Sequence, residues 1–213
     1  MKIYSVGIVD YGMGNHASVV HSLRDIGFRV RVSNNTADLD EADVLILPGV
    51  GAFPSAMATL HERGMVDYLH QQANLGRPLI GICLGMQLLA NASYEHKHTV
   101  GLGLIPGDIV PFVDHGGHIG WNTLEFSQNN SLWSKSDGAA FYFNHSFCYQ
   151  GPPEYQVAVT QHSIPFPSII KRGSVIGLQF HPEKSQLAGK VLLKNLIEGL
   201  VDAYKTFSWC GYS

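Results

Sequence analysis

The sequence lacks several features that would place it in other classes of protein. Its 213 residues contain only three cysteines, Cys83, Cys148 and Cys210, and this odd number at wide spacing makes neither a disulfide framework nor a paired metal-ligand motif. Charged residues form 15% of the chain and the net charge is −3, with no cluster of Lys and Arg that could neutralise a run of phosphates. We therefore expect a chain of the reducing cytoplasm with no nucleic-acid partner.

Long hydrophobic runs are also missing. No window approaches the roughly 18 uninterrupted apolar residues that span a bilayer. Residues 1–10 carry a short apolar run that ends at Asp10, without the cleavage site of a secretory signal. We therefore expect a protein of the cytoplasm with no membrane partner. Apolar residues make up 45% of the chain, which suits one globular domain over residues 1–213, with residues 206–213 as a tail.

The first half of the chain alternates short apolar runs with amphipathic stretches, which predicts parallel strands joined by helices. The expected strands are Ile3–Val9, Phe28–Val32, Val44–Leu47 and Leu79–Ile82, and the expected helices cover residues 15–26, 54–60 and 86–89. From about Gly101 the texture changes to short β-like runs, for which we expect antiparallel strands at 107–113, 139–143, 155–160 and 175–180. A last helix is predicted over Leu187–Tyr204.

The sharpest chemical signal is Gly81-Ile82-Cys83-Leu84-Gly85, placed where an apolar strand gives way to a helix. This pattern resembles a nucleophile elbow, in which small residues on both sides let neighbouring backbone come close to a strained turn. The first turn of a helix favours a thiolate at Cys83. The alternative is a buried structural cysteine, a description that fits Cys148 and Cys210 well.

A thiol nucleophile needs a base and a group that orients the base. His181 follows the apolar run Val175–Phe180, and Glu183 follows across the rigid Pro182. The carboxylate of Glu183 can reach back to the imidazole and fix its tautomer. The chain has 11 histidines, and any one of them is more often a surface or core residue than a catalytic one. Only its pairing with an elbow cysteine makes His181 a candidate for catalysis.

The third element is Pro48-Gly49-Val50-Gly51 at the end of another strand. Backbone amides around Gly49, Val50 and Gly51 can point at a developing oxyanion, a role also open to the amide of Leu84. Taken alone, this stretch is nearly as well described as an ordinary turn from strand to helix.

Together the three motifs resemble those of the class I, triad-type glutamine amidotransferases, in the order that this family shows. The resemblance implies a flavodoxin-like α/β fold with a mixed central sheet flanked by helices, and neither a metal nor an organic cofactor. Further stretches resemble the branch of the family that supplies ammonia to a (βα)8-barrel cyclase in histidine biosynthesis. These stretches are Asp10–Asn15, Pro48–Phe53, Gly81–Gln87, His118–Asn122, Tyr142–Ser146 and Gln179–Ser185.

Roles follow from the resemblance, position by position. Cys83 would form a γ-glutamyl thioester, His181 would carry the proton and Glu183 would orient it. The L-glutamine substrate would be held by Gln87, Glu95, His145, Ser146 and Phe147. Asn15, Trp121, Asn122 and Tyr142 would lie near the cyclase in a heterodimer. Trp121 and Tyr142 could instead fill the core, and Asn15 could cap the first helix.

The chain departs from the family pattern at several positions on the expected partner face. His115-Gly116-Gly117 stands where the family has Lys-x-Pro, and Asn144 and Phe147 replace a Val and a Tyr. One alternative is therefore a related glutaminase subunit that feeds a surface-sugar amidotransferase. A cysteine peptidase or hydrolase on a similar scaffold and a non-catalytic regulator are two others.

Overall fold

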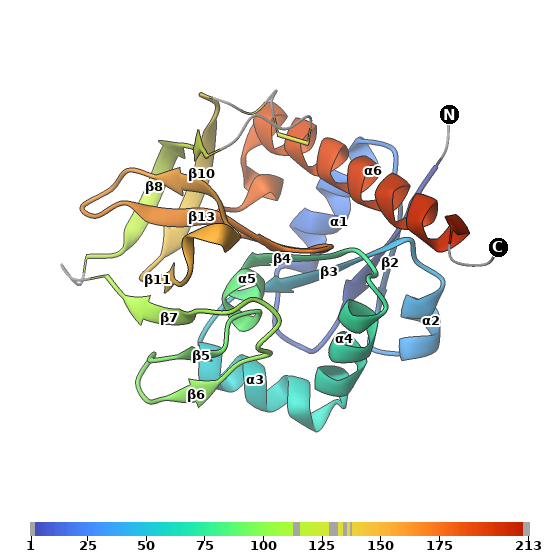
Figure 1. Cartoon of the computed structure of the whole chain (residues 1–213), viewed down its shortest axis with the longest axis horizontal. Helices are drawn as coiled ribbons and strands as arrows, with labels where there is room; N and C mark the ends of the chain where they lie inside the picture. The colour runs from blue at the N-terminus through green and yellow to red at the C-terminus, as the bar shows by residue number, and fades with distance from the viewer. Residues whose placement is uncertain (1–2, 113–115, 128–131, 134–135, 137, 211–213) are drawn as a thin grey trace.

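The computed structural model describes residues 3–112, 116–127, 132–133, 136 and 138–210, with only the backbone for 207–210 (Figure 1). Its centre is an eight-stranded sheet in the order β2-β1-β3-β4-β14-β13-β12-β9. The first five strands in that order are parallel: β2 (Arg29–Ser33), β1 (Ser5–Val9), β3 (Val44–Gly49), β4 (Leu79–Cys83) and β14 (Val175–Leu178). The last three are antiparallel: β13 (Phe166–Arg172), β12 (Gln156–Thr160) and β9 (Glu125–Phe126).

Helices cover both faces of the central sheet. Figure 1 shows α1 (His16–Asp25) and α6 (Gln186–Cys210) on one side, and α3 (Phe53–Glu62), α4 (Met65–Asn74) and the short α5 (Leu84–Leu88) on the other. A further short helix, α2 (Thr36–Asp40), connects β2 to β3. The order β2-β1-β3-β4-β14 of the parallel part is the flavodoxin-like order, so the predicted fold class is confirmed.

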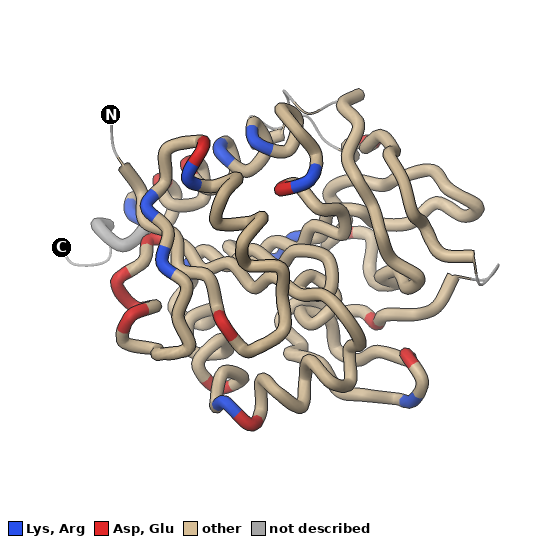
Figure 2. The backbone as a smooth tube through the Cα atoms, turned by 180° about the vertical axis from the view of Figure 1, so that it is seen from behind, with Lys and Arg blue, Asp and Glu red and all other residues tan. Residues whose placement is uncertain are grey.

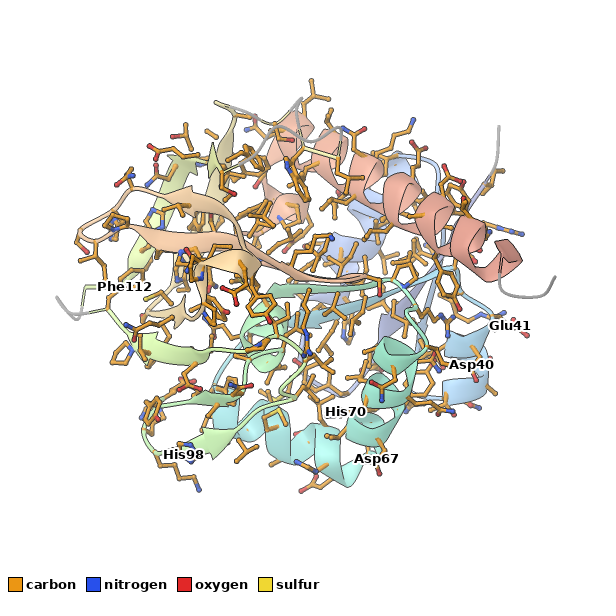
Figure 3. All side chains as sticks on the ribbon, viewed as in Figure 1. Asp40, Glu41, Asp67, His70, His98 and Phe112 are labelled. Atoms are coloured by element: carbon orange, nitrogen blue, oxygen red, sulfur yellow. The ribbon has the colours of Figure 1, made fainter. Side chains whose placement is uncertain are left out.

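The core consists of two apolar layers, one on each face of the sheet. One joins Val19 and Leu23 of α1 to Leu192 and Leu196 of α6, and the other joins helices α3, α4 and α5 to the opposite face. Strand β3 is buried along its whole length, as expected for a parallel strand with helices above and below. Figure 3 shows side chains filling the space on both sides of the sheet.

Two smaller sheets stand beside the carboxyl ends of the parallel strands. One is the antiparallel pair β8 (His118–Thr123) and β10 (Ala140–His145). The other has four strands in the order β11-β7-β5-β6, formed by Phe147–Gln150, Asp108–Pro111, Ala92–Ser93 and Thr99–Val100. Both bring backbone from the second half of the chain over the sheet edge where β3, β4 and β14 end.

The structure differs from the sequence expectations in several places, among them the unpredicted helix α2. The run 175–180, grouped with antiparallel strands, contains β14, which pairs parallel to β4 and antiparallel to β13. Helix α4 was not predicted, although its buried residues Met65, Tyr68, Leu69 and Gln72 fall at helical spacing. Helix α6 continues past Tyr204 to Cys210, so the expected tail is helical as far as residue 210, and residues 211–213 lie outside the described part.

Candidate active site

The residues singled out by the sequence meet at the carboxyl ends of three adjacent parallel strands. Gly49 at the end of β3 pairs in register with Cys83 at the end of β4. Leu178 of β14 pairs with Ile82, so the chain after β14 reaches His181 beside the same edge. Cys83 and His181 line one pocket of about 300 Å³. Segments about a hundred residues apart in sequence therefore share one site because β4 and β14 are neighbours.

The elbow around Cys83 has the backbone strain that its motif predicts. Cys83 has φ 55° and ψ −112° and precedes α5, so it lies in a region that residues other than glycine rarely occupy. A Cβ atom at Gly85 would lie 1.8 Å from the carbonyl oxygen of Leu47, and one at Gly81 would lie 2.5 Å from the carbonyl oxygen of Gly85. Glycine is required at both positions for the turn to pack against β3.

His181 and Glu183 form a buried pair. His181 Nδ1 lies 2.8 Å from Glu183 Oε1, and the two side chains are 4% and 2% exposed. Burial lowers the pKa of His181, but hydrogen bonding with Cys83 and with Glu183 outweighs it and raises the pKa to about 9. Because Nδ1 faces the carboxylate, Nε2 is left for the thiol, which is the arrangement of a nucleophile, a base and an orienting acid.

Backbone contacts hold the His181 segment in place. The amide of His181 donates to the carbonyl oxygen of Tyr142 at 2.8 Å. The buried Ser185 hydroxyl donates to the His181 carbonyl at 2.6 Å and accepts from the Tyr142 amide at 3.0 Å. Ser185 thus links His181 to β10. The sequence placed Ser185 in a motif but indicated no role for it.

Three of the four predicted oxyanion residues line the pocket. Val50, Gly51 and Leu84 line it, while a Cβ at Gly49 would lie 2.8 Å from both the Gly85 amide and the Tyr11 hydroxyl. The Tyr11 hydroxyl has no hydrogen-bond partner among the described residues. Burial, and then the charge of Cys83, raise the pKa of this phenol. Tyr11 is therefore a neutral group beneath the elbow, and sequence reasoning gave it no role.

Gln87 is held so that its carbonyl oxygen is left to act as the acceptor. Its Nε2 donates to the Phe147 carbonyl oxygen and to Oε1 of Gln179, each at 3.2 Å. Both acceptors are carbonyl oxygens, so the opposite orientation of the amide would place oxygen against oxygen. Because Gln87 lines the pocket, its Oε1 can accept from an amino or amide group of a substrate. Gln179 was quoted within a motif without any role.

The other expected substrate contacts also line the pocket. Glu95 reaches it from the loop after β5, and His145, Ser146 and Phe147 reach it from the turn between β10 and β11. His145 Nδ1 lies 2.8 Å from the Phe147 carbonyl oxygen. Burial first, partly offset by that hydrogen bond, lowers the pKa of His145 to about 3. His145 is therefore neutral at physiological pH.

Of the expected partner residues, Tyr142 lies beside the site, with its ring centroid 6.4 Å from that of His181. Trp121 is 50% exposed and its ring centroid lies 6.0 Å from that of Tyr142 on the neighbouring strand, so Trp121 does not fill the core. Lys184, which sequence reasoning left without a role, lines the pocket and lies over the Tyr142 ring at 5.8 Å. Asn122 donates to the Gln161 carbonyl oxygen at 2.7 Å, and Asn15 caps α1 by accepting from the Ser18 amide.

The departures from the family pattern fall where backbone, rather than side chain, makes the contact. Cys83 Sγ lies 3.9 Å from the main-chain oxygen of Asn144, and Phe147 uses its carbonyl oxygen towards Gln87 and His145. A change of side chain at 144 or 147 leaves these contacts possible. Gly117 accepts from His162 through its carbonyl oxygen, whereas His115 lies outside the described residues.

Two further features bear on the chemistry. In the part of the chain that the structure describes, no group of three or more His, Cys, Asp or Glu side chains is arranged to hold a metal ion. Among the same residues, no helix combines the length and apolar character needed to cross a bilayer. The reactive side chains that the site brings together are a thiol, an imidazole and a carboxylate.

A thiol paired with a buried imidazole and carboxylate, on an elbow beside a glycine-rich strand end, defines a thiol-dependent acyl-transfer site on a flavodoxin-like fold. The chain belongs to the glutamine amidotransferase class-I family, whose model matches residues 7–198. The sequence prediction of this family is confirmed.

Individual relatives indicate which members of the family this chain resembles. The chain is 44% identical to the imidazole glycerol phosphate synthase subunit HisH of Listeria innocua over 195 residues, which cover 90% of this chain and 94% of that protein. It is 43% identical to the subunit of the same name from Bacillus cereus over 204 residues, covering 94% and 97%. In fold it resembles a chain of the PurLQS structure from Thermotoga maritima, with a TM-score of 0.75, 20% identity and coverage of 94% and 100%.

Proposed function

We propose that this chain is the glutaminase subunit of an imidazole glycerol phosphate synthase, which hydrolyses L-glutamine and passes the ammonia to a (βα)8-barrel cyclase. The observation that carries the proposal is the convergence of Cys83 with the buried His181–Glu183 pair in a pocket that Gln87 and Glu95 also line. The level of identity to HisH subunits over most of the chain supports the same assignment.

The geometry supports a two-step reaction. The Cys83 thiolate attacks the carboxamide carbon of glutamine, and backbone amides of Val50 or Gly51 and of Leu84 stabilise the oxyanion. The C–N bond then breaks, His181 gives its proton to the departing ammonia, and a γ-glutamyl thioester remains on Cys83. Water, giving a proton back to His181, attacks the thioester and releases glutamate and the free thiol.

The fate of the released ammonia is the reason that the chain needs a partner subunit. Ammonia released into bulk water at neutral pH is protonated and lost as a nucleophile, so a synthase must receive it from an enclosed route. The side chains of Trp121, Ile119 and Leu187 are between 50% and 73% exposed. Figure 2 shows few charged residues at the end of the molecule formed by β8 and β10, compared with the end near the termini. We assign this apolar face to the cyclase, which yields imidazole glycerol phosphate and AICAR in histidine biosynthesis.

The test is to combine the chain with candidate barrel synthases and to measure glutamate release with and without each synthase's substrate. The cyclase of histidine biosynthesis should form a heterodimer and increase glutamate release. Cys83→Ala should abolish glutamine-dependent synthesis, while synthesis from added ammonium salts by the same complex should persist.

The control keeps the complex and changes only the nitrogen source. Glutamine-dependent turnover in Cys83→Ala would show that Cys83 is not the nucleophile. Stimulation by a surface-sugar synthase but not by the cyclase would instead reassign the partner and leave the glutaminase chemistry intact. Release of an amino acid from peptides, without hydrolysis of glutamine, would identify the chain as a cysteine peptidase.

A further inference from the structure

The carboxylate of Glu95 makes a contact that its expected role in substrate binding does not require. Its Oε2 accepts a hydrogen bond from the backbone amide of Phe53 at 2.7 Å. The Glu95 side chain is 13% exposed, and its backbone amide is fixed by the Ser93 hydroxyl at 3.1 Å. Glu95 lies on the hairpin between β5 and β6 whose outer part carries His98 in Figure 3. The hairpin is thus tied to the first residue of α3.

Helix α3 depends on this contact because its own sequence supplies no side-chain cap. The N-cap residue is Ala52, which has no side chain that could accept a hydrogen bond, and Pro54 has no N–H to be satisfied. Phe53 has the first amide of the helix, and its partner is a carboxylate, the group that a helix N-terminus favours. Glu95 therefore acts as the cap of α3 from another segment.

The same contact fixes one end of the oxyanion loop. Its other end is Gly49, which pairs with Cys83 in the sheet. Only Val50, Gly51 and Ala52 lie between these two fixed points, so the directions of the Val50 and Gly51 amides depend on both anchors. Gly51 has φ +98°, in the region that favours glycine. The residues next to Gly51 do not impose this conformation, so the loop needs its two anchors to hold it. Movement of Phe53 would redirect the amides of Val50 and Gly51, which line the same pocket as Cys83.

We propose that Glu95 is a positioning residue of the oxyanion loop as well as a substrate contact, with one carboxylate oxygen for each task. Oε2 holds Phe53, and Oε1, whose one neighbouring basic group among the described residues is the exposed His96 with Nε2 at 3.9 Å, is placed to meet the α-ammonium group of the substrate. This inference rests on the proposed function and deepens it. The site that selects an α-amino acid and the loop that stabilises the oxyanion share one carboxylate, so binding of the ammonium group is coupled to the loop.

Two variants and two substrates separate the two tasks of Glu95. Glu95→Gln keeps an acceptor for the Phe53 amide and loses the charge, whereas Glu95→Ala loses both. Glutaramate is glutamine without its α-amino group. Its turnover therefore depends on the contact between Glu95 and Phe53 but not on the contact with the ammonium group. With glutaramate, measured as ammonia release by the complex, Glu95→Ala should have a kcat/KM at least about tenfold below that of Glu95→Gln. With glutamine, both variants should show a raised KM, and only Glu95→Ala should also lose kcat.

A capping variant separates loop geometry from helix stability. Ala52→Ser, added to Glu95→Ala, provides a side-chain acceptor for the Ser55 amide at an N-cap position with extended backbone. The double variant should regain thermal stability but not the lost turnover, because the Phe53 amide stays without its partner. Recovery of turnover together with stability would reduce Glu95 to a helix cap and overturn the proposal.

Hydrogen exchange at the Phe53 amide gives a readout that needs no activity. Exchange should be faster in Glu95→Ala than in the wild type and unchanged in Glu95→Gln. Equal glutaramate turnover in all three proteins, or equal Phe53 exchange, would refute the anchor. If the wild type hydrolysed neither substrate with any synthase, the proposed function would fail, whereas the exchange rates would still decide whether Glu95 holds the loop.

Discussion

Nδ1 of His181 lies 2.8 Å from Oε1 of Glu183, and this pair is almost completely closed to solvent. The contact fixes which imidazole nitrogen faces Cys83, because a carboxylate can only accept from the Nδ1–H. The first prediction is that Glu183→Gln lowers kcat for glutamine at least about a hundredfold, since the amide no longer enforces that tautomer. Steady-state glutamate release measures it, and a loss under threefold would contradict it.

The same pair predicts a pH effect on stability. The pKa of His181 is raised to about 9, above the value of about 6.5 in an unfolded chain. A raised pKa contributes stability that is fully present below pH 6.5 and is lost as pH rises through 9. The difference in unfolding free energy between wild type and Glu183→Gln should therefore be largest below about pH 6.5 and shrink towards pH 9. Urea denaturation at a series of pH values measures it, and a constant difference would count against the assignment.

A second pH effect comes from His118 and His145, which pair at the ends of β8 and β10 and whose ring centroids lie 5.7 Å apart. Burial first, and then the nearby His162, lowers the pKa of His118 to about 4. A lowered pKa gives stability that is present above about pH 6.5 and is lost as pH falls towards the folded value. His118→Phe should make the loss of stability between about pH 6.5 and 4 less steep. Thermal unfolding across that range tests it, with exposed His21→Phe as the control.

Gln179 should affect substrate affinity without touching the thiol. Its Oε1 accepts from Gln87 Nε2, so Gln179→Leu leaves the Gln87 amide with the Phe147 carbonyl as its only acceptor. We expect KM for glutamine to rise about tenfold, with a change of less than about threefold in kcat. Alkylation of Cys83 by iodoacetamide should proceed as in the wild type. Gln156→Leu, which removes an amide outside the pocket, should leave KM unchanged.

The elbow glycine at position 85 should tolerate no side chain. A Cβ there would lie 1.8 Å from the Leu47 carbonyl oxygen, and its next neighbours are backbone carbon atoms of Leu47 and Pro48, which cannot rotate away. Gly85→Ala should destabilise the fold by about 3 kcal/mol or more or abolish soluble expression. The matched control is Gly64→Asn, where φ is +65° and no atom lies within 4 Å of the added Cβ. That variant should change stability by less than about 1 kcal/mol.

Hydrophobic pattern predicted the elements that are buried and regular. The apolar run from Val44 to Leu47 reads as a parallel strand because it is buried on both faces, and the structure extends it to Gly49. Pattern alone did not reveal which strands pair. The run 175–180 looks like its antiparallel neighbours in sequence, yet it contains β14, which enters the parallel sheet beside β4. Strand order depends on contacts between distant segments, which local periodicity does not record.

The active-site residues also fall into two groups, those that the sequence identifies and those that only the folded structure reveals. Cys83 and His181 were accessible from sequence because an elbow needs glycines at fixed spacing and a base needs an orienting acid nearby. Tyr11 and Gln179 have no such local signature, since their importance comes only from contacts made across the fold. Glu95 was expected to meet the substrate, but its bond to Phe53 depends on how the β5–β6 hairpin folds over α3. The roles of the substrate and partner residues stay predictions.

The pairing of β4 with β14 has a consequence for when the chain becomes reactive during its synthesis. The strand that carries the thiol is complete by residue 83, whereas the strand that leads to the imidazole begins at residue 175. A growing chain on the ribosome therefore has a nucleophile without a base until about its last fifth has emerged and docked. Chains cut short before that docking should therefore hydrolyse no glutamine.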